Sequence, residues 1–304
     1  MDNNKNMLQD IYKKLRSNLS ASSIRTYSSL VRNLAEKLNI EINDSKDVEK
    51  HLSKIVEHLK TLNDKQRKTL CSALVVLCSA DKGDACQTLR DMMMKSIKKS
   101  EEEDEKQLMT VKEKENWISY TDLMKKYNEL ENIIKPLLKL EKLNKHQFNQ
   151  MQTYVILSFL YGAGLPPRRS QDYTELKYKD YDPEKDNYID LKKGIVHYNV
   201  FKTAKNYKGG QSINLPTKMK KILKDWLRYA EGDYLFVDSR KNKLNQTKLT
   251  MLLNNFFDKK VSTNMIRHSY LTHVYENVPK DLPEMMAHSQ NMSLKYRRVD
   301  APKN

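Results

Sequence analysis

The sequence predicts a mainly α-helical chain that carries one small antiparallel sheet and divides into two domains. Apolar residues recur at steps of three and four along most of the chain, which is the period of an amphipathic helix. Alternation typical of strands occurs in one stretch, residues 187–216. The chain has 304 residues, more than the roughly 250–300 at which a single hydrophobic core stops growing, so two cores are expected.

The first hundred residues are predicted to form a small bundle of helices. In the stretch LSASSIRTYSSLVRNLAEKLN, residues 19–39, Ser20 or Ser22 is suited to cap a helix N-terminus. The apolar stripe that follows consists of Ile24, Tyr27, Leu30, Leu34 and Leu38. Similar spacing in VEKHLSKIVEHLKTL and in KQRKTLCSALVVLCSA predicts at least two more helices.

A charged stretch marks the predicted domain boundary. KSIKKSEEEDEK, residues 95–106, changes from basic to acidic and has no apolar residue after Ile97. Such composition is typical of a solvated linker. We therefore expect a helical domain at 1–98, a charged linker at 99–110 and a second domain at 111–304.

The second domain is predicted to be mixed. Helical patterns occupy YTDLMKKYNELENIIKPLLKL and then MQTYVILSFLYGAG, where Gly162 and Gly164 end the helix. The segments YIDL, IVHYNVF and QSINL then alternate as strands, joined through KKG and KTAKNYKGG, which predicts a three-stranded antiparallel meander. Helical patterns return after Pro216.

Composition limits the class of protein. No apolar run approaches the roughly 18 residues that a membrane span needs, and the start MDNNKNMLQDIYKKL is no signal peptide, so we expect a soluble intracellular protein. Cys71, Cys78 and Cys86 are too few and too clustered for a disulfide framework and lack C-x-x-C spacing for zinc. We expect them to be reduced and mostly buried.

Charge points to a polyanionic partner. The net charge is +16, and two basic blocks flank a neutral middle: residues 1–100 carry 19 basic against 12 acidic side chains, and residues 201–304 carry 20 against 9. Lysines that face phosphates release counterions and supply most sequence-independent affinity for nucleic acid. A solvated basic surface with no such partner is the ordinary alternative.

Common cofactor motifs are absent from the sequence. KNYKGGQ lacks the order of a phosphate-binding P-loop, and the chain contains neither G-x-G-x-x-G nor H-E-x-x-H. His268 and His273 are five residues apart, so on a helix their side chains point about 140° away from each other and are not expected to bind one metal together. We therefore expect no metal and no cofactor.

Several residues are suited to phosphoryl transfer. In LYGAGLPPRRSQDYTEL, Arg169 and Asp172 are three apart, so on a helix the carboxylate can hold the guanidinium. Lys202 ends the strand IVHYNVF at a hairpin turn, where a flexible ammonium can reach a ligand. Arg267 lies on the predicted helix NMIRHSYLTHVY. Each has an ordinary alternative, such as a surface ion pair or a local cap.

The last candidate stretch is AHSQNMSLKYRR, which contains His288 and Tyr296. Taken alone, it is better explained as a core helix with a solvated tail. The order Arg, Lys, Arg, His, Tyr changes that interpretation, because it resembles the tyrosine recombinase (phage-type integrase) family. The resemblance rests on GLPPRRSQD, VFKTAK, MIRHSY and AHSQNMSLKY, and LSASSIRTYSSLVRNLAEKL is similar to the helical core-binding domain of that family.

The resemblance implies an α/β catalytic domain behind a core-type DNA-binding domain, and a site-specific recombinase that cleaves and rejoins DNA through a 3′-phosphotyrosyl link without metal or ATP. Tyr296 would be the nucleophile. Arg169 and Arg267 would clamp the scissile phosphate, Lys202 would protonate the leaving 5′-oxygen, and His288 would bind a non-bridging oxygen. Double-stranded DNA is the implied partner, with a homotetramer on paired sites and no membrane. The DNA-binding residues expected are Arg25, Lys205 and Lys208.

Three features depart from the usual family pattern. Asn264 stands where a histidine is usual, and an asparagine can donate a hydrogen bond to a phosphate but cannot carry its charge. The Asp172 carboxylate would hold the first arginine in place, and Asn264 would be a weaker helper. His288 and Tyr296 are eight apart where nine is commoner, and the PPRR run leaves a choice between Arg168 and Arg169. Arg169 is preferred, because it alone has an acidic residue three positions later.

These departures, together with a lysine- and asparagine-rich composition, make the chain more similar to the divergent recombinases of large DNA viruses, their satellites or mobile elements than to the bacterial chromosome-resolution enzymes. Two rival hypotheses stay open. One is a type IB topoisomerase-like enzyme that relaxes supercoils with the same chemistry, and the other is a catalytically decayed DNA-binding protein.

Overall fold

The computed structural model describes residues 2–80, 83–207, 210–274, 285–286 and 298. The chain divides into two compact units, Met1–Lys106 and Gln107–Asn304. This division falls inside the segment predicted as a linker. Residues 99–105 are nevertheless helical and form the last turns of helix α6. Their acidic side chains are mostly exposed.

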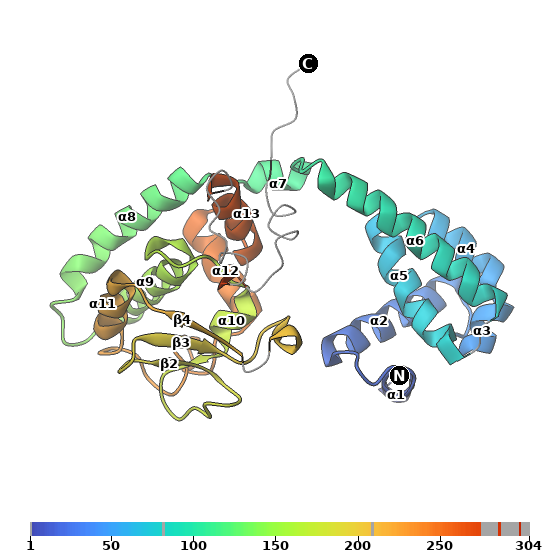
Figure 1. Ribbon diagram of the computed structural model, residues 1–304, viewed down its shortest axis with the longest axis horizontal. Coiled ribbons are helices and arrows are strands. Elements are labelled where there is room, and N and C mark those ends of the chain that lie inside the picture. Colours follow the sequence, from blue (N-terminus) through green and yellow to red (C-terminus); the bar gives the residue numbers. More distant parts are fainter. Residues whose placement is uncertain (1, 81–82, 208–209, 275–284, 287–297, 299–304) are drawn as a thin grey trace, which may run out of the picture. The chain divides into compact units, whose positions relative to one another are not determined.

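The first unit consists of helices, as its apolar periodicity predicts (Figure 1). Their bounds are α1 Asp2–Leu15, α2 Ala21–Leu38, α3 Ser45–Lys50, α4 Leu52–Lys60, α5 Asp64–Leu77 and α6 Asp84–Glu105. The predicted helix at 19–39 is confirmed as α2: Ser20 is its N-cap and accepts from the N–H of Ser23, and Asn39 ends it in the left-handed conformation.

Apolar side chains from these helices form one core. Ile24, Val31 and Leu34 on α2 are buried with residues from α1, α4 and α5. The three cysteines are free and buried, as predicted, and burial raises the pKa of the Cys71 thiol to about 11. Hydrophobic burial along helical stripes therefore accounts for this unit.

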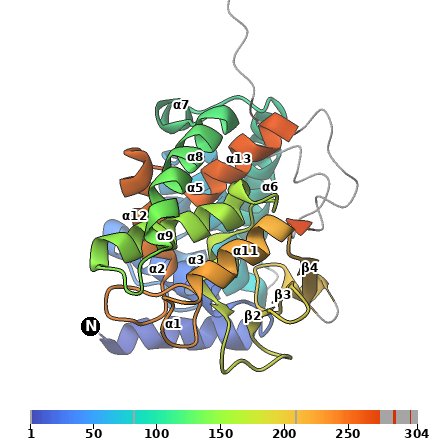
Figure 2. The same cartoon turned by 90° about the vertical axis from the view of Figure 1, so that its left-hand side faces the viewer.

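The second unit combines its sheet with further helices. These are α7 Val111–Asn116, α8 Tyr120–Leu137, α9 Lys145–Leu157, α10 Ser170–Thr174, α11 Thr217–Trp226, α12 Gln246–Phe257 and α13 Thr263–Val274. Helices α8 and α9 run side by side in both views (Figure 1, Figure 2). Among the described residues, no helix combines the length and apolarity that crossing a bilayer requires.

The apolar helix predicted to stop at Gly162 and Gly164 does so through a π-helical turn, Ser158–Gly162. Glycine is needed at position 162 because a Cβ there would clash with the ring of Tyr127 on α8. Gly164 has φ +81°, a conformation that favours glycine. The chain then enters the GLPPRR segment that leads to α10.

The sheet has four strands in the order β1-β2-β3-β4. The antiparallel pairing of β2 (Asn187–Asp190), β3 (Ile195–Tyr198) and β4 (Gln211–Asn214) confirms the predicted meander. The predicted count of three strands is wrong, because β1 (Leu176–Lys177) pairs in parallel with β2. A strand of two residues is too short to show alternation in the sequence.

Candidate active site

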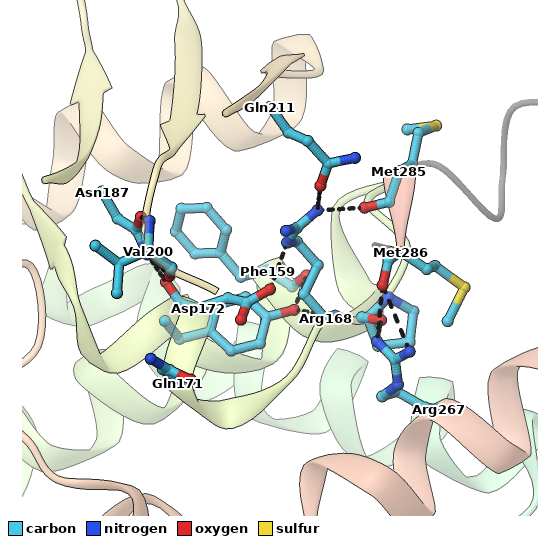
Figure 3. A network of polar contacts seen from close by, with 12 residues as sticks. Phe159, Arg168, Gln171, Asp172, Asn187, Val200, Gln211, Arg267, Met285 and Met286 are labelled. Atoms are coloured by element: carbon cyan, nitrogen blue, oxygen red, sulfur yellow. Dashed lines mark hydrogen bonds and ion pairs between the residues drawn. The ribbon is translucent and has the colours of Figure 1, made fainter. Parts of the chain in front are cut away.

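Arg168 is a buried arginine at the entrance to α10. Its side chain is 2% exposed, and its Nε donates to Asp172 Oδ2 at 2.7 Å. Its Nη1 donates to Gln211 Oε1 at 2.9 Å and to the carbonyl of Met285 at 2.7 Å (Figure 3). The guanidinium carbon lies 4.0 Å from the centre of the Tyr198 ring, a cation–π contact.

The predicted pairing of Asp172 with Arg169 is wrong, because the carboxylate binds Arg168 instead. Helix α10 begins at Ser170, and Arg169 is its N-cap residue with extended backbone, φ −77° and ψ 156°. Side chains three apart share a face only inside a helix, whereas neighbouring side chains on extended backbone point to opposite sides. Arg168 therefore faces the interior, and Arg169 is half-buried.

Arg267 is the second buried arginine of the site, and its side chain is fully buried on α13. Its Nη1 donates to the carbonyl of Pro167 at 2.7 Å and, more weakly, to that of Met286 at 3.4 Å. The adjacent carbonyls of Met285 and Met286 thus accept from the two arginines, one each (Figure 3). The structure therefore brings Arg168 and Arg267, which are far apart in the sequence, close together in space.

The described part of the site carries a surplus of positive charge. Two guanidinium groups lie beside one carboxylate, Asp172, whose side chain is 1% exposed. Burial raises the pKa of the Asp172 carboxyl, and the neighbouring Arg168 guanidinium opposes that rise. Among the described residues, Arg168 Nη2 and Asp172 Oδ1 are buried without a hydrogen-bond partner. Guanidinium groups with a donor still without a partner can bind an oxyanion such as a phosphate.

Lys202 directly follows Phe201, a residue that packs against Arg168. Strand β3 ends at Tyr198 rather than continuing to Phe201 as predicted, and Lys202 is exposed in the following turn. Phe201 is buried, with its ring centre 5.2 Å from the Arg168 guanidinium carbon. The residue before the lysine therefore packs on the first arginine.

Comparison with known proteins decides the family. The model of the phage integrase family matches residues 128–302. The chain belongs to the phage integrase family. It is also 28% identical over 145 residues to tyrosine recombinase XerA of Thermococcus onnurineus (strain NA1). That match covers 44% of this chain and 46% of the relative, so the chain spans about half the length of the curated relative it matches.

Solved structures share the fold of this phage integrase family member. A lambda integrase (75–356) dimer bound to a COC′ core site has a TM-score of 0.53 at 14% identity, covering 98% of this chain and 96% of that one. A second lambda integrase dimer on a COC′ core site also has a TM-score of 0.53, at 13% identity, covering 98% and 78%. The mainly helical architecture with a small mixed sheet is thus that of tyrosine recombinases.

The remaining predicted residues of this phage integrase family chain are spread over both units. Asn264 is exposed on the first turn of α13, three residues before Arg267. Lys205 is exposed in the 3₁₀ turn Ala204–Asn206, and Arg25 is exposed on α2 in the first unit. His288, Tyr296 and Lys208 lie outside the described residues.

Two described anchors flank the segment that contains His288 and Tyr296. Met286, fully buried, packs with Leu271 of α13. Beyond the segment, the N–H of Arg298 donates to Thr272 Oγ1 at 3.0 Å, and its Nε forms an ion pair with Glu113 at 3.2 Å. The chain is therefore held to neighbouring positions on α13 before residue 287 and after residue 297.

Sequence reasoning missed the supporting residues of the site. Gln211, which accepts from Arg168, lies 43 positions away, and no local motif marks it. Glu113 was detectable as the last residue of a capping box with Thr110, but its ion pair with Arg298 was not. Among the described residues, no group of three or more histidine, cysteine, aspartate or glutamate side chains could hold a metal.

Proposed function

We propose that this chain is a site-specific DNA recombinase that cleaves and rejoins DNA through a 3′-phosphotyrosyl intermediate. One observation carries the proposal: Arg168 and Arg267 bind the adjacent carbonyls of Met285 and Met286, three and two positions before His288, in a member of the phage integrase family. The relative named tyrosine recombinase XerA and the lambda integrase dimers bound to a core site support the same function.

The proposed reaction exchanges one phosphoester for another. The Tyr296 oxygen forms a bond to phosphorus as the bond to the 5′-oxygen breaks, and the phenolic proton leaves to solvent. Lys202 gives a proton to the departing 5′-oxygen. A 5′-hydroxyl of the partner strand reverses these steps and releases the tyrosine. The phosphoester bond is conserved throughout, so no ATP is consumed.

The two buried arginines would stabilise the negative charge that develops on the phosphate in the transition state. We assign the clamp to Arg168 and Arg267, because Asp172, on which the choice of Arg169 depended, pairs with Arg168. The donor groups now bound to the carbonyls of Met285 and Met286 would turn to the non-bridging oxygens of the phosphate, where charge gathers in the transition state. Arg169 stays a prediction to be tested beside Arg168.

The remaining roles follow from chemistry and position. His288 would donate to a non-bridging oxygen, and exposed Asn264 can add a neutral hydrogen bond but no proton. Exposed Arg25 and Lys205, with Lys208, would contact DNA phosphates, which gives affinity without sequence information. We propose a homotetramer on two paired DNA sites as the recombining assembly.

Covalent capture tests the proposal without a known target site. The protein is incubated with a pool of short duplexes of randomised sequence, each nicked so that the released fragment diffuses away, and complexes resistant to detergent are recovered and sequenced. We expect wild-type protein to capture a defined subset, and Tyr296→Phe to capture none. Failure of folded protein to capture any duplex, or an adduct on Tyr296→Phe, would contradict the assignment.

A plasmid assay separates the proposed recombinase from its relaxing rival. Plasmids with one or two copies of the captured sequence are treated with protein, and topology and connectivity are read on gels. Recombinant product from two-site plasmids is expected. Relaxation of supercoils with no recombinant would favour the topoisomerase-like alternative.

A further inference from the structure

Asn187, the first residue of β2, forms the densest set of side-chain hydrogen bonds near the site. Its Oδ1 accepts from the N–H groups of Asn199 at 2.8 Å and Val200 at 2.7 Å. Its Nδ2 donates to the carbonyls of Val200 at 2.8 Å and Asp172 at 3.3 Å (Figure 3). An amide offers two acceptor and two donor positions, so this fully buried side chain uses its whole capacity.

These bonds explain why β3 ends early. The N–H groups of Asn199 and Val200 pair with a side chain rather than with a neighbouring strand, so the ladder stops at Tyr198. The Asn199 side chain fixes the same turn from the other side, by donating to the carbonyls of Pro183 and Asp186 at 2.8 Å each. The backbone at 199–200 is therefore held on both sides.

The held backbone leads directly to Lys202. Val200 precedes the lysine by two residues, and Phe201 between them is buried against the Arg168 guanidinium. On its other side, the Asn187 amide binds the main chain of Asp172, whose carboxylate pairs with Arg168. One side chain thus links the turn that carries the lysine to the helix that orients the arginine.

We infer that Asn187 is a positioning residue that holds the Lys202 turn in register with Arg168. This inference rests on the proposed function. The lysine side chain is exposed and flexible, so the reach of its ammonium depends on where its backbone is fixed. A misplacement of about 1 Å in a reacting group can cost on the order of 100-fold in rate. Loss of Asn187 is expected to impair proton delivery specifically.

A sulfur leaving group isolates that step. A duplex captured by the wild-type protein is synthesised with either oxygen or sulfur at the bridging 5′ position of the scissile phosphate. A thiol has a pKa of roughly 8.5, so a thiolate departs without receiving a proton. We expect Asn187→Ala to cleave the oxygen substrate at least about 10-fold more slowly than wild type, and the sulfur substrate within about 3-fold.

Matched variants calibrate this result. Lys202→Ala is expected to show the same rescue by sulfur, whereas Arg267→Ala is slow on both substrates because the phosphate charge stays unbalanced. Gln152→Ala is the control for loss of a buried amide: Gln152 bonds the N–H and carbonyl of Val237 at 2.9 and 3.0 Å, away from the site. We expect it to lower stability without changing the ratio of the two rates.

The outcomes separate this inference from the proposed function. If wild-type protein captures no duplex, the proposed function fails. If wild type cleaves but Asn187→Ala is slowed equally on both substrates, or if Lys202→Ala is not rescued, the positioning role is overturned. Should Asn187→Ala not fold, Asn187→Gln keeps the amide one methylene further from the backbone, and the same selective rescue is expected.

Discussion

The interiors of the two units differ in kind. Among the described residues, the buried polar side chains of the first unit are three serines, Ser28, Ser96 and Ser100. The second unit also buries Arg168, Arg267, Asp172, Asn187 and Gln152. Burying a charge is unfavourable unless it is paired, so the second interior depends on specific partners where the first depends on apolar volume. Stability and site geometry are therefore coupled in the second unit.

Replacing each arginine of the PPRR run tests this coupling most strongly. Arg168→Ala leaves the Asp172 carboxylate buried without its partner, and we expect a loss of about 3–5 kcal/mol in the free energy of unfolding. Arg169→Ala, at a half-buried N-cap, is expected to lose about 1 kcal/mol or less. Urea unfolding of the second unit measures both, and adduct formation by Arg169→Ala but not Arg168→Ala supports the assignment of the clamp.

The pH dependence of the free energy of unfolding of Arg168→Ala gives a second test of the Arg168–Asp172 pairing. Burial already raises the pKa of Asp172, and removing Arg168 removes the strongest of the three arginines that oppose that rise. A carboxyl with a raised folded-state pKa destabilises the fold as pH rises and ceases to do so once protonated. The deficit of Arg168→Ala should therefore shrink as pH falls below neutrality. A deficit independent of pH would mean that Asp172 is not the buried charge left behind.

A core truncation in the first unit provides the contrast. Leu74 on α5 is fully buried in the apolar cluster, and Leu74→Ala is expected to cost about 2–5 kcal/mol. No titratable group is left without a partner by this change, so the loss should be nearly constant between pH 5 and pH 8, the roughly optimal range for stability. A strong pH dependence would contradict the view that apolar volume alone holds this unit.

A small effect, similar to that of Arg169→Ala, is expected at the Glu113–Arg298 pair. Burial raises the pKa of Glu113, but hydrogen bonds from Thr110 and the charge of Arg298 outweigh it, so the pKa is lowered from 4.5. A lowered carboxyl pKa contributes stability above the unfolded-state value, and this contribution is lost as pH falls through the folded-state value. Glu113→Gln should cost about 1 kcal/mol at pH 7 and nothing at pH values well below 4. Thermal unfolding across this range measures it.

The sequence predicts what depends on local repetition. Helix α2 and strands β2 and β4 follow from apolar periodicity and have bounds close to those predicted, whereas β3 ends at Tyr198 instead of Phe201. The pairing of Arg168 was missed because residue spacing does not reveal whether the backbone is helical or extended at Arg169. Asn187 was missed because its partners lie 12 to 15 positions away and are backbone groups, which leave no trace in the sequence.

The anchors at Met286 and Arg298 bear on the role proposed for Tyr296. Leu271 and Thr272, consecutive residues of α13, hold the chain at the two ends of the eleven residues 287–297. Tyr296 precedes Arg298 by two residues, a reach of about 7 Å at full extension. A group on so short a tether has an effective concentration on the order of millimolar at its own site. If Tyr296 is the nucleophile and the proposed homotetramer forms, a tyrosine from a second copy would have to compete with this tethered group.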